Sequence, residues 1–168
     1  MLFFRPDLLP PSVQLSPGRH KYIVAKLRDP LPLPVVRDKD DDTNDGTTNT
    51  VVQHSSHIPT RKVRWFVVSA ASQDCGGPYH VNVANQLLEW IQCVPGYETA
   101  DVVITGGGRI DYHQMTATPT VRVYGFSYRY GKGDHERVAT MIQESLLGTT
   151  ANDTTTTVVT YDDSDELY

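Results

Sequence analysis

The chain has 168 residues, of which 39% are hydrophobic and 21% are charged, and this length and balance are typical of one domain with its own core rather than two domains. No apolar run approaches the roughly 20 residues that a bilayer span needs, and the apolar start at residues 1–4 gives way to Arg5 and Pro6 too early for a signal peptide. The two cysteines form neither a disulfide framework nor a zinc pattern. We therefore expect a cytoplasmic protein with no membrane span.

The formal net charge of −5 conceals an uneven distribution. Residues 38–45 and residues 162–166 each carry a net charge of −4, which leaves the remainder of the chain at about +3 by the same count. A mildly basic body suits an anionic ligand, although ordinary scatter of surface charge explains the same numbers. The basic residues do not form a stripe with interleaved aromatic residues, so nucleic acid is not an expected partner.

In the first half of the chain, two strands are expected on either side of a long polar segment. Residues 21–27 are rich in β-forming residues and predict a strand. Residues 30–59 consist mainly of proline, aspartate, threonine and asparagine, which predicts a mobile acidic insertion outside the core. Residues 63–71 predict the second strand, and residues 72–78 have the composition of a loop.

A helix is expected from His80 to Gln92, because apolar residues recur at helical spacing and Pro95 and Gly96 close the segment. Residues 100–105 then predict a buried strand. The glycines at residues 106–108 predict a tight turn, and a return strand is expected to begin at Arg109.

The last third predicts a strand over residues 120–124, a loop over residues 125–133, a helix capped by Asp134 with Gly148 at its C-terminal cap, and a final strand over residues 154–161. The sum is about six strands and two or three helices without strict alternation. This pattern favours an α/β fold in a single domain, with a mixed, roughly six-stranded sheet flanked by helices. We expect the domain to span residues 13–161 and an acidic tail to follow at residues 162–168.

Histidine is the first candidate for chemistry, because no serine or cysteine lies in a nucleophile motif such as G-x-S-x-G. His54 and His57 are spaced like a metal-binding pair, but no cysteine or carboxylate cluster accompanies them at ligand spacing, so no metal is expected. His80 lies where a loop reaches a helix N-terminus, and free N–H groups there favour an anion such as phosphate. The other interpretation of His80 is a structural or exposed histidine.

Two glycine-containing segments are further candidates for anion binding. The glycines at residues 106–108 are not a Walker loop, because no Gly-Lys-Ser/Thr follows them. They place Arg109 either as a fixed phosphate partner or as a surface cation. Residues 125–131 are bracketed by glycines and could curl so that successive N–H groups form an anion nest.

Taken together and in order, these segments resemble the phosphohistidine phosphatase family, also called the Janus/ocnus family. The resemblance covers most of the chain apart from the first dozen residues and the acidic insertion. It rests on the strand at residues 21–24, on Tyr79-His80 before a helix, on residues 106–110, on residues 121–131 with His135 after them, and on residues 159–163.

The resemblance implies a small α/β fold with a mixed sheet, and removal of phosphate from histidine in other proteins without a metal or other cofactor. It gives His80 the role of the general base that activates water. The phosphate-binding residues that it implies are Lys21, Ser127, Tyr128, Arg129 and the supporting Arg109. Phosphohistidine-containing proteins are the implied partners of a protein that is expected to be monomeric and not bound to a membrane.

The chain departs from this family pattern at several points. The family has a small residue where Arg129 stands, and it has an arginine upstream of Tyr79 for which the chain offers Arg64 or no equivalent. The acidic insertion is not part of the pattern. A non-catalytic regulatory module that binds phosphohistidine or another anion is the alternative function, and acceptance of phospholysine stays open.

Overall fold

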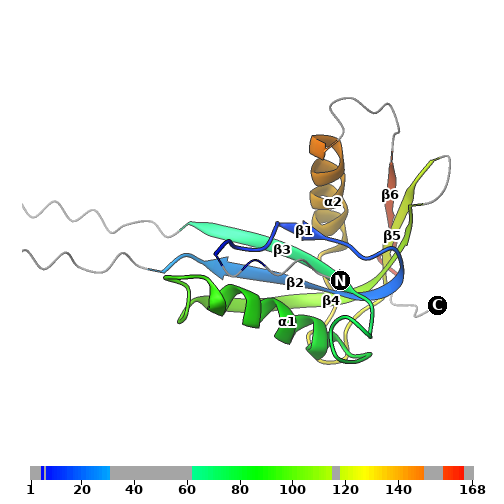
Figure 1. The fold of residues 1–168 in the computed structure, drawn as a ribbon. Coiled ribbons are helices and arrows are strands. Elements are labelled where there is room, and N and C mark those ends of the chain that lie inside the picture. The colour runs from blue at the N-terminus through cyan, green and yellow to red at the C-terminus, as the bar shows by residue number, and fades with distance from the viewer. Residues whose placement is uncertain (1–4, 6, 31–61, 115–117, 150–156, 165–168) are drawn as a thin grey trace, which may run out of the picture.

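The computed structural model describes residue 5 and residues 7–30, 62–114, 118–149 and 157–164 (Figure 1). The insertion expected at residues 30–59 lies outside the described residues except for Pro30, and so do His54, His57 and the last four residues of the acidic tail.

Six strands form one sheet in the order β1-β3-β2-β4-β5-β6. The outer pairs β1–β3 and β5–β6 are parallel, and the three inner pairs are antiparallel. The predicted α/β fold in a single domain with a mixed six-stranded sheet is therefore confirmed. The strands are β1 (Val13–Gln14), β2 (Gly18–Arg28), β3 (Val63–Ala70), β4 (Asp101–His113), β5 (Thr120–Tyr124) and β6 (Val158–Tyr161).

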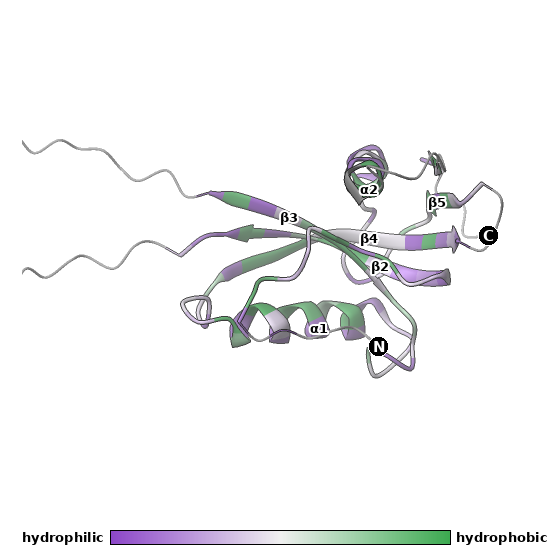
Figure 2. Ribbon diagram, turned by 45° about the horizontal axis from the view of Figure 1, so that its top comes forward, coloured by the Kyte–Doolittle hydropathy of each residue, from purple (hydrophilic) through white to green (hydrophobic). Residues whose placement is uncertain are grey.

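The two helices cover opposite faces of the sheet, as Figure 2 shows: α1 (His80–Cys93) on one face and α2 (His135–Thr149) on the other. Side chains alternate along β2, so that Ile23 and Ala25 pack under α1 while Tyr22 and Val24 pack under α2. The sheet thus separates two apolar layers. In the described part of the chain, neither helix is long and apolar enough to cross a membrane.

The predicted tight turn at residues 106–108 is wrong, because β4 runs without a break through the three glycines. A Cβ atom on Gly106 would lie 2.5 Å from the Lys132 carbonyl oxygen, and one on Gly108 would lie 2.6 Å from the Tyr124 carbonyl oxygen. Any side chain would therefore collide with neighbouring backbone. The glycines allow segments to approach β4 closely, and the register of the β2–β4 pair shifts at this stretch.

The sequence predicted the observed number of strands only because two errors in the prediction cancel. The return strand expected from Arg109 is part of β4, whereas the two-residue β1 was not predicted. Gly148 lies inside α2 rather than at its C-terminal cap. The final strand begins at Val158, and residues 154–156 of the predicted strand lie outside the described residues.

Candidate functional site

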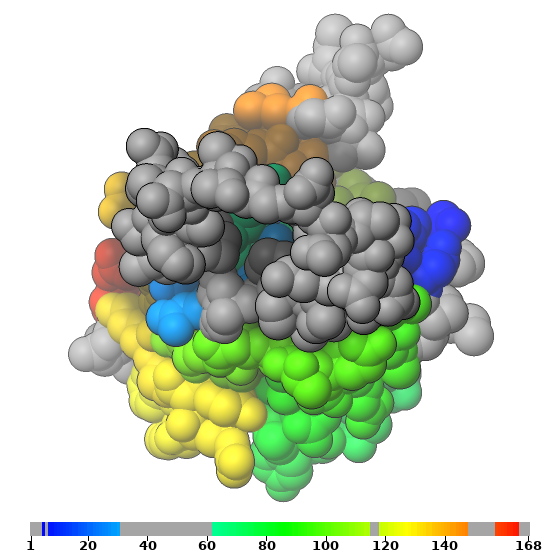
Figure 3. Space-filling view, turned by 90° about the vertical axis from the view of Figure 1, so that its left-hand side faces the viewer, coloured from blue at the N-terminus to red at the C-terminus, as the bar shows by residue number. Residues whose placement is uncertain are grey.

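A pocket of about 370 Å³ opens where the start of α1 meets β2, β4 and the loop after β5. Figure 3 shows this loop, in yellow, against the green part of the chain that includes α1 and β4. Three cationic side chains line the pocket, namely Lys21, Arg109 and Arg129, and no described aspartate or glutamate does so. The pocket is therefore locally positive in a chain whose net charge is −5, which favours an anionic ligand.

His80 is the titratable group of this pocket whose protonation state can be inferred from its contacts. Its Nε2 lies 2.9 Å from the Gly108 carbonyl oxygen, and because a carbonyl only accepts, Nε2 carries the proton and Nδ1 keeps a lone pair. Burial lowers the pKa of His80, the positive charges of Lys21 and Arg109 lower it further, and the bond to Gly108 opposes them. His80 is therefore a neutral base at neutral pH.

The first turn of α1 leaves two backbone donors available to the pocket. The Asn82 Oδ1 accepts from the Tyr79 N–H at 3.1 Å, and the Asn82 N–H donates to the Tyr79 carbonyl at 3.0 Å. The N–H groups of His80 and Val81 find no acceptor among the described residues, and both residues line the pocket. With the positive end of the helix dipole, they add to the positive potential of the pocket.

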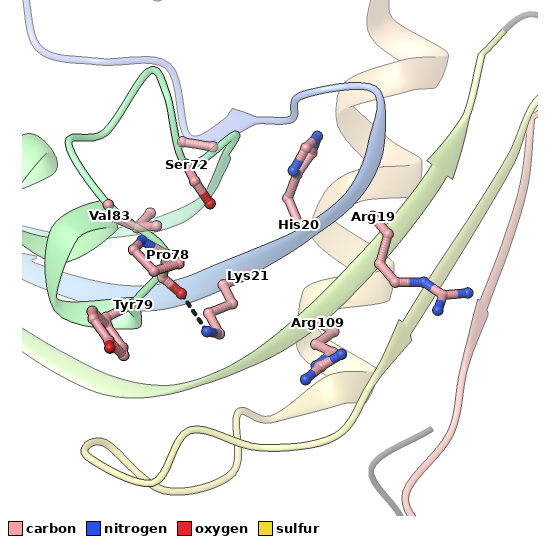
Figure 4. Close-up of a pocket in the computed structure, with 10 residues that line it drawn as sticks. Arg19, His20, Lys21, Ser72, Pro78, Tyr79, Val83 and Arg109 are labelled. Atoms are coloured by element: carbon pink, nitrogen blue, oxygen red, sulfur yellow. Dashed lines mark hydrogen bonds between the residues drawn. The ribbon is translucent and has the colours of Figure 1, made fainter.

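Lys21 and Arg109 are brought together by sheet register, because they are directly paired across β2 and β4. Figure 4 shows both side chains, with the Lys21 Nζ directed at the Pro78 carbonyl oxygen, to which it donates. The same Nζ lies 5.5 Å from the centre of the Tyr79 ring. No acceptor or acid within the described residues engages the Arg109 side chain, so its guanidinium has five donors to offer a ligand.

Hydrogen bonds within the loop after β5 hold residues 127–131 in a compact turn. The N–H of Ser127 donates to the Gly131 carbonyl at 3.1 Å, and the Oγ of Ser127 accepts from the Tyr130 N–H at 3.2 Å. Ser127 is almost fully buried. Its N–H is therefore occupied and its hydroxyl proton remains to donate, whereas the N–H groups of Tyr128 and Arg129 have no acceptor in the described part of the chain.

Gly107 sets how closely these parts approach one another. Its N–H donates to the Gly131 carbonyl at 3.2 Å, which ties the loop to β4. A Cβ atom here would lie 2.6 Å from the Tyr22 carbonyl oxygen and 3.1 Å from the His80 Cδ2. Only a glycine lets His80 lie against β4 and reach Gly108.

All six residues predicted for the site line this one pocket; they are Lys21, His80, Arg109, Ser127, Tyr128 and Arg129. Their individual roles stay predictions. Arg64 does not join them, because it lies near the start of β3 and pairs with Asp29 at 3.1 Å. The pocket also includes Val81 and Phe126, which the sequence did not single out, and no pattern of spacing distinguishes such apolar lining from core. Among the described residues, no group of three or more histidine, cysteine, aspartate or glutamate side chains could hold a metal ion.

A family model described as the Janus/Ocnus family matches residues 9–149. The chain belongs to the Janus/Ocnus family. The sequence resemblance was equated with a phosphohistidine phosphatase family, and this identification is wrong. The family that matches is Janus/Ocnus, which is not a phosphohistidine phosphatase family. Membership of the Janus/Ocnus family therefore does not by itself establish an activity for this protein. No curated protein matches the chain.

Proposed function

We propose that the protein hydrolyses the P–N bond of phosphohistidine in other proteins, with His80 as the general base and without a metal or other cofactor. One observation carries this proposal: a neutral imidazole, whose Nδ1 has no partner among the described residues, lies in a pocket lined by three cations and by no aspartate or glutamate from the same part of the chain. Phosphohistidine-containing proteins are the partners. The protein acts as a monomer in the cytoplasm.

The reaction needs a bound phosphoryl group and one water molecule. The guanidinium of Arg109, the ammonium of Lys21 and the free N–H groups of Tyr128 and Arg129 bind the phosphoryl oxygens. Water attacks phosphorus opposite the nitrogen while Nδ1 of His80 takes the water proton. The P–N bond breaks, its electron pair stays on the imidazole nitrogen of the substrate, and inorganic phosphate leaves.

The composition of the pocket favours a P–N over a P–O bond. The leaving imidazole of phosphohistidine is a good leaving group once its second ring nitrogen is protonated, whereas a serine alkoxide needs a proton from a general acid. No carboxyl or thiol group of the described residues lines the pocket. His80 is neutral because burial lowers its pKa, and its one ring proton is donated to the Gly108 carbonyl oxygen. Positioning and charge stabilisation are therefore the main tasks left to the protein.

A phosphohistidine- or anion-binding module is the second candidate, because the free Arg109 guanidinium and the loop N–H groups would bind an anion whether or not water attacks it. Substitutions Lys21→Ala and Arg109→Ala separate the two functions. A hydrolase loses kcat/KM with each, whereas a binding module loses affinity and shows no turnover in any form.

The test is phosphate release from a phosphohistidine peptide by the unmodified protein and by His80→Ala, with EDTA in every reaction and a phosphoserine peptide for comparison. We expect release from phosphohistidine alone, with kcat lower by about 10² to 10⁴ in His80→Ala. His113→Ala is the matched control, because His113 is 61% exposed at the end of β4 and does not line the pocket. Full turnover by a folded His80→Ala protein, or release from phosphoserine at an equal rate, would contradict the proposal.

A further inference from the structure

Two large aromatic side chains at the mouth of the pocket are exposed. Tyr79 is 65% exposed and Tyr128 is 87% exposed, and they come from different segments, one before α1 and one in the loop after β5. Exposed aromatic side chains that gather at a pocket mark a binding surface more often than single exposed apolar residues do. Together with Phe126 we call these residues the aromatic rim.

Neighbouring groups hold the rings of the aromatic rim in place. Phe126 and Tyr128 meet edge to face with ring centres 5.1 Å apart. The Tyr79 ring is contacted by the Lys21 ammonium, 5.5 Å from its centre, and Figure 4 shows the two side chains side by side. A rim that is ordered before binding loses less conformational freedom when a ligand arrives.

The rim and the cations act on different parts of one ligand. Arg109, Lys21 and the loop N–H groups attract the phosphoryl group, and the aromatic rim lines the same pocket, so the group bonded to phosphorus lies within reach of the rim. A flat ring at that position contacts aromatic faces over its whole surface, whereas a flexible alkyl chain loses conformational freedom and makes fewer contacts.

We propose that the aromatic rim selects phosphoryl groups carried on a flat ring, namely the imidazole of phosphohistidine, over those carried on an alkyl chain, as in phospholysine. This inference rests on the proposed function for the identity of the substrate. The binding preference itself depends only on the rim and the cations beneath it, so it can be measured without turnover.

The test compares the affinities of phenylphosphonate and butylphosphonate, measured by calorimetry, because neither compound can be hydrolysed. We expect phenylphosphonate to bind about tenfold more tightly, the ratio that one stacking contact supplies. In Tyr79→Leu/Tyr128→Leu the preference should fall to within about twofold, because leucine retains apolar area without a flat face. Tyr161→Leu is the control, since Tyr161 is 46% exposed on β6 and does not line the pocket.

Equal binding of the two compounds by the unmodified protein, or an undiminished preference in the double variant, would overturn the inference. Kinetics on phosphohistidine and phospholysine peptides then separate it from the proposed function. A preference for phenylphosphonate without hydrolysis of either peptide leaves the rim proposal intact and contradicts the hydrolase. Equal kcat/KM on both peptides contradicts the rim proposal and leaves the hydrolase intact.

Discussion

Both helices in the described part of the chain begin with a histidine, and the surroundings of these two histidines differ. His80 opens α1 and His135 opens α2. His80 lines a pocket and its Nδ1 has no partner among the described residues, whereas His135 is 1% exposed and its Nδ1 donates to the Asp162 carbonyl oxygen at 2.8 Å. The same residue at the same helical position thus lines a pocket in one helix and is enclosed in the core in the other.

The charges around the two helix starts explain the difference. At α2, the Asp134 carboxylate accepts from the Arg137 N–H at 3.0 Å, and Glu136 adds a second acid in the first turn. At α1 the N-cap residue is Tyr79, whose N–H donates to the neutral side-chain amide of Asn82, and the first turn holds no acid. One helix dipole is already neutralised by the protein's own carboxylates, and the other is left available for a ligand anion.

The largest expected effect is a difference in turnover between variants of the two histidines. His80→Ala should lower kcat by about 10² to 10⁴, and it should also lower stability, because it removes a buried ring and leaves the Gly108 carbonyl oxygen without its donor. His135→Ala should lower the free energy of unfolding by about 3 kcal/mol, because it removes a buried ring and leaves the Asp162 carbonyl oxygen without its donor. Urea denaturation and phosphate release, both measured for each variant, check the pair. A large loss of turnover in folded His135→Ala would break the contrast between the two helices.

The close contact at Gly107 should give the next largest effect. Gly107→Ala places a Cβ atom against the Tyr22 carbonyl and the His80 ring, and we expect a loss of about 1 to 3 kcal/mol in stability. kcat/KM should fall as well, because His80 is pushed away from Gly108. Gly76→Ala is the comparison, since nothing lies within 4 Å of its added Cβ and the only cost is its positive φ of 75°. Thermal melts and kinetics should show loss of activity in Gly107→Ala alone.

The sequence was sufficient for the fold class and for the helix that begins at His80, because alternation and helical spacing are local signals. It could not distinguish a glycine run that turns from one that packs, since the crowding at residues 106–108 comes from Tyr22, Tyr124 and Lys132, which lie elsewhere in the chain. The position of a histidine at a helix start was equally uninformative, because His135 shares it. What distinguishes His80 is the set of charges that the fold assembles around it.

A smaller effect is expected when a carboxylate is introduced at the start of α1. Asn82→Asp makes this helix resemble α2, and an acid in the first turn should raise stability by about 0.3 to 1 kcal/mol. The same charge should weaken phosphonate binding by about threefold, because the carboxylate repels the anion and solvent screens only part of this repulsion. Calorimetry with phenylphosphonate measures the loss. Asp134→Asn, which removes a charge from α2, is the control and should leave the affinity unchanged.

The last effect concerns pH, namely the acid limb of the pH profile. Below its pKa His80 carries a second proton, Nδ1 loses its lone pair, and kcat/KM should fall about tenfold for each pH unit. Because burial and two neighbouring cations lower this pKa, the midpoint should lie below the ordinary value of 6.5. The rate of uncatalysed hydrolysis must be subtracted at each pH.

Lys21→Ala identifies the group that titrates. Removing this ammonium takes away one of the two charges that lower the pKa of His80, so the midpoint should move upward. Burial, the largest cause of the shift, and the charge of Arg109 remain in this variant, so Lys21 accounts for only part of the shift. An NMR titration of the His80 ring in the free protein should give the same midpoint as kcat/KM, since kcat/KM reports the ionisation of free enzyme. If the midpoint in Lys21→Ala equals that of the unmodified protein, the acid limb of the pH profile belongs to another group. The assignment of His80 as the base would then lose its support.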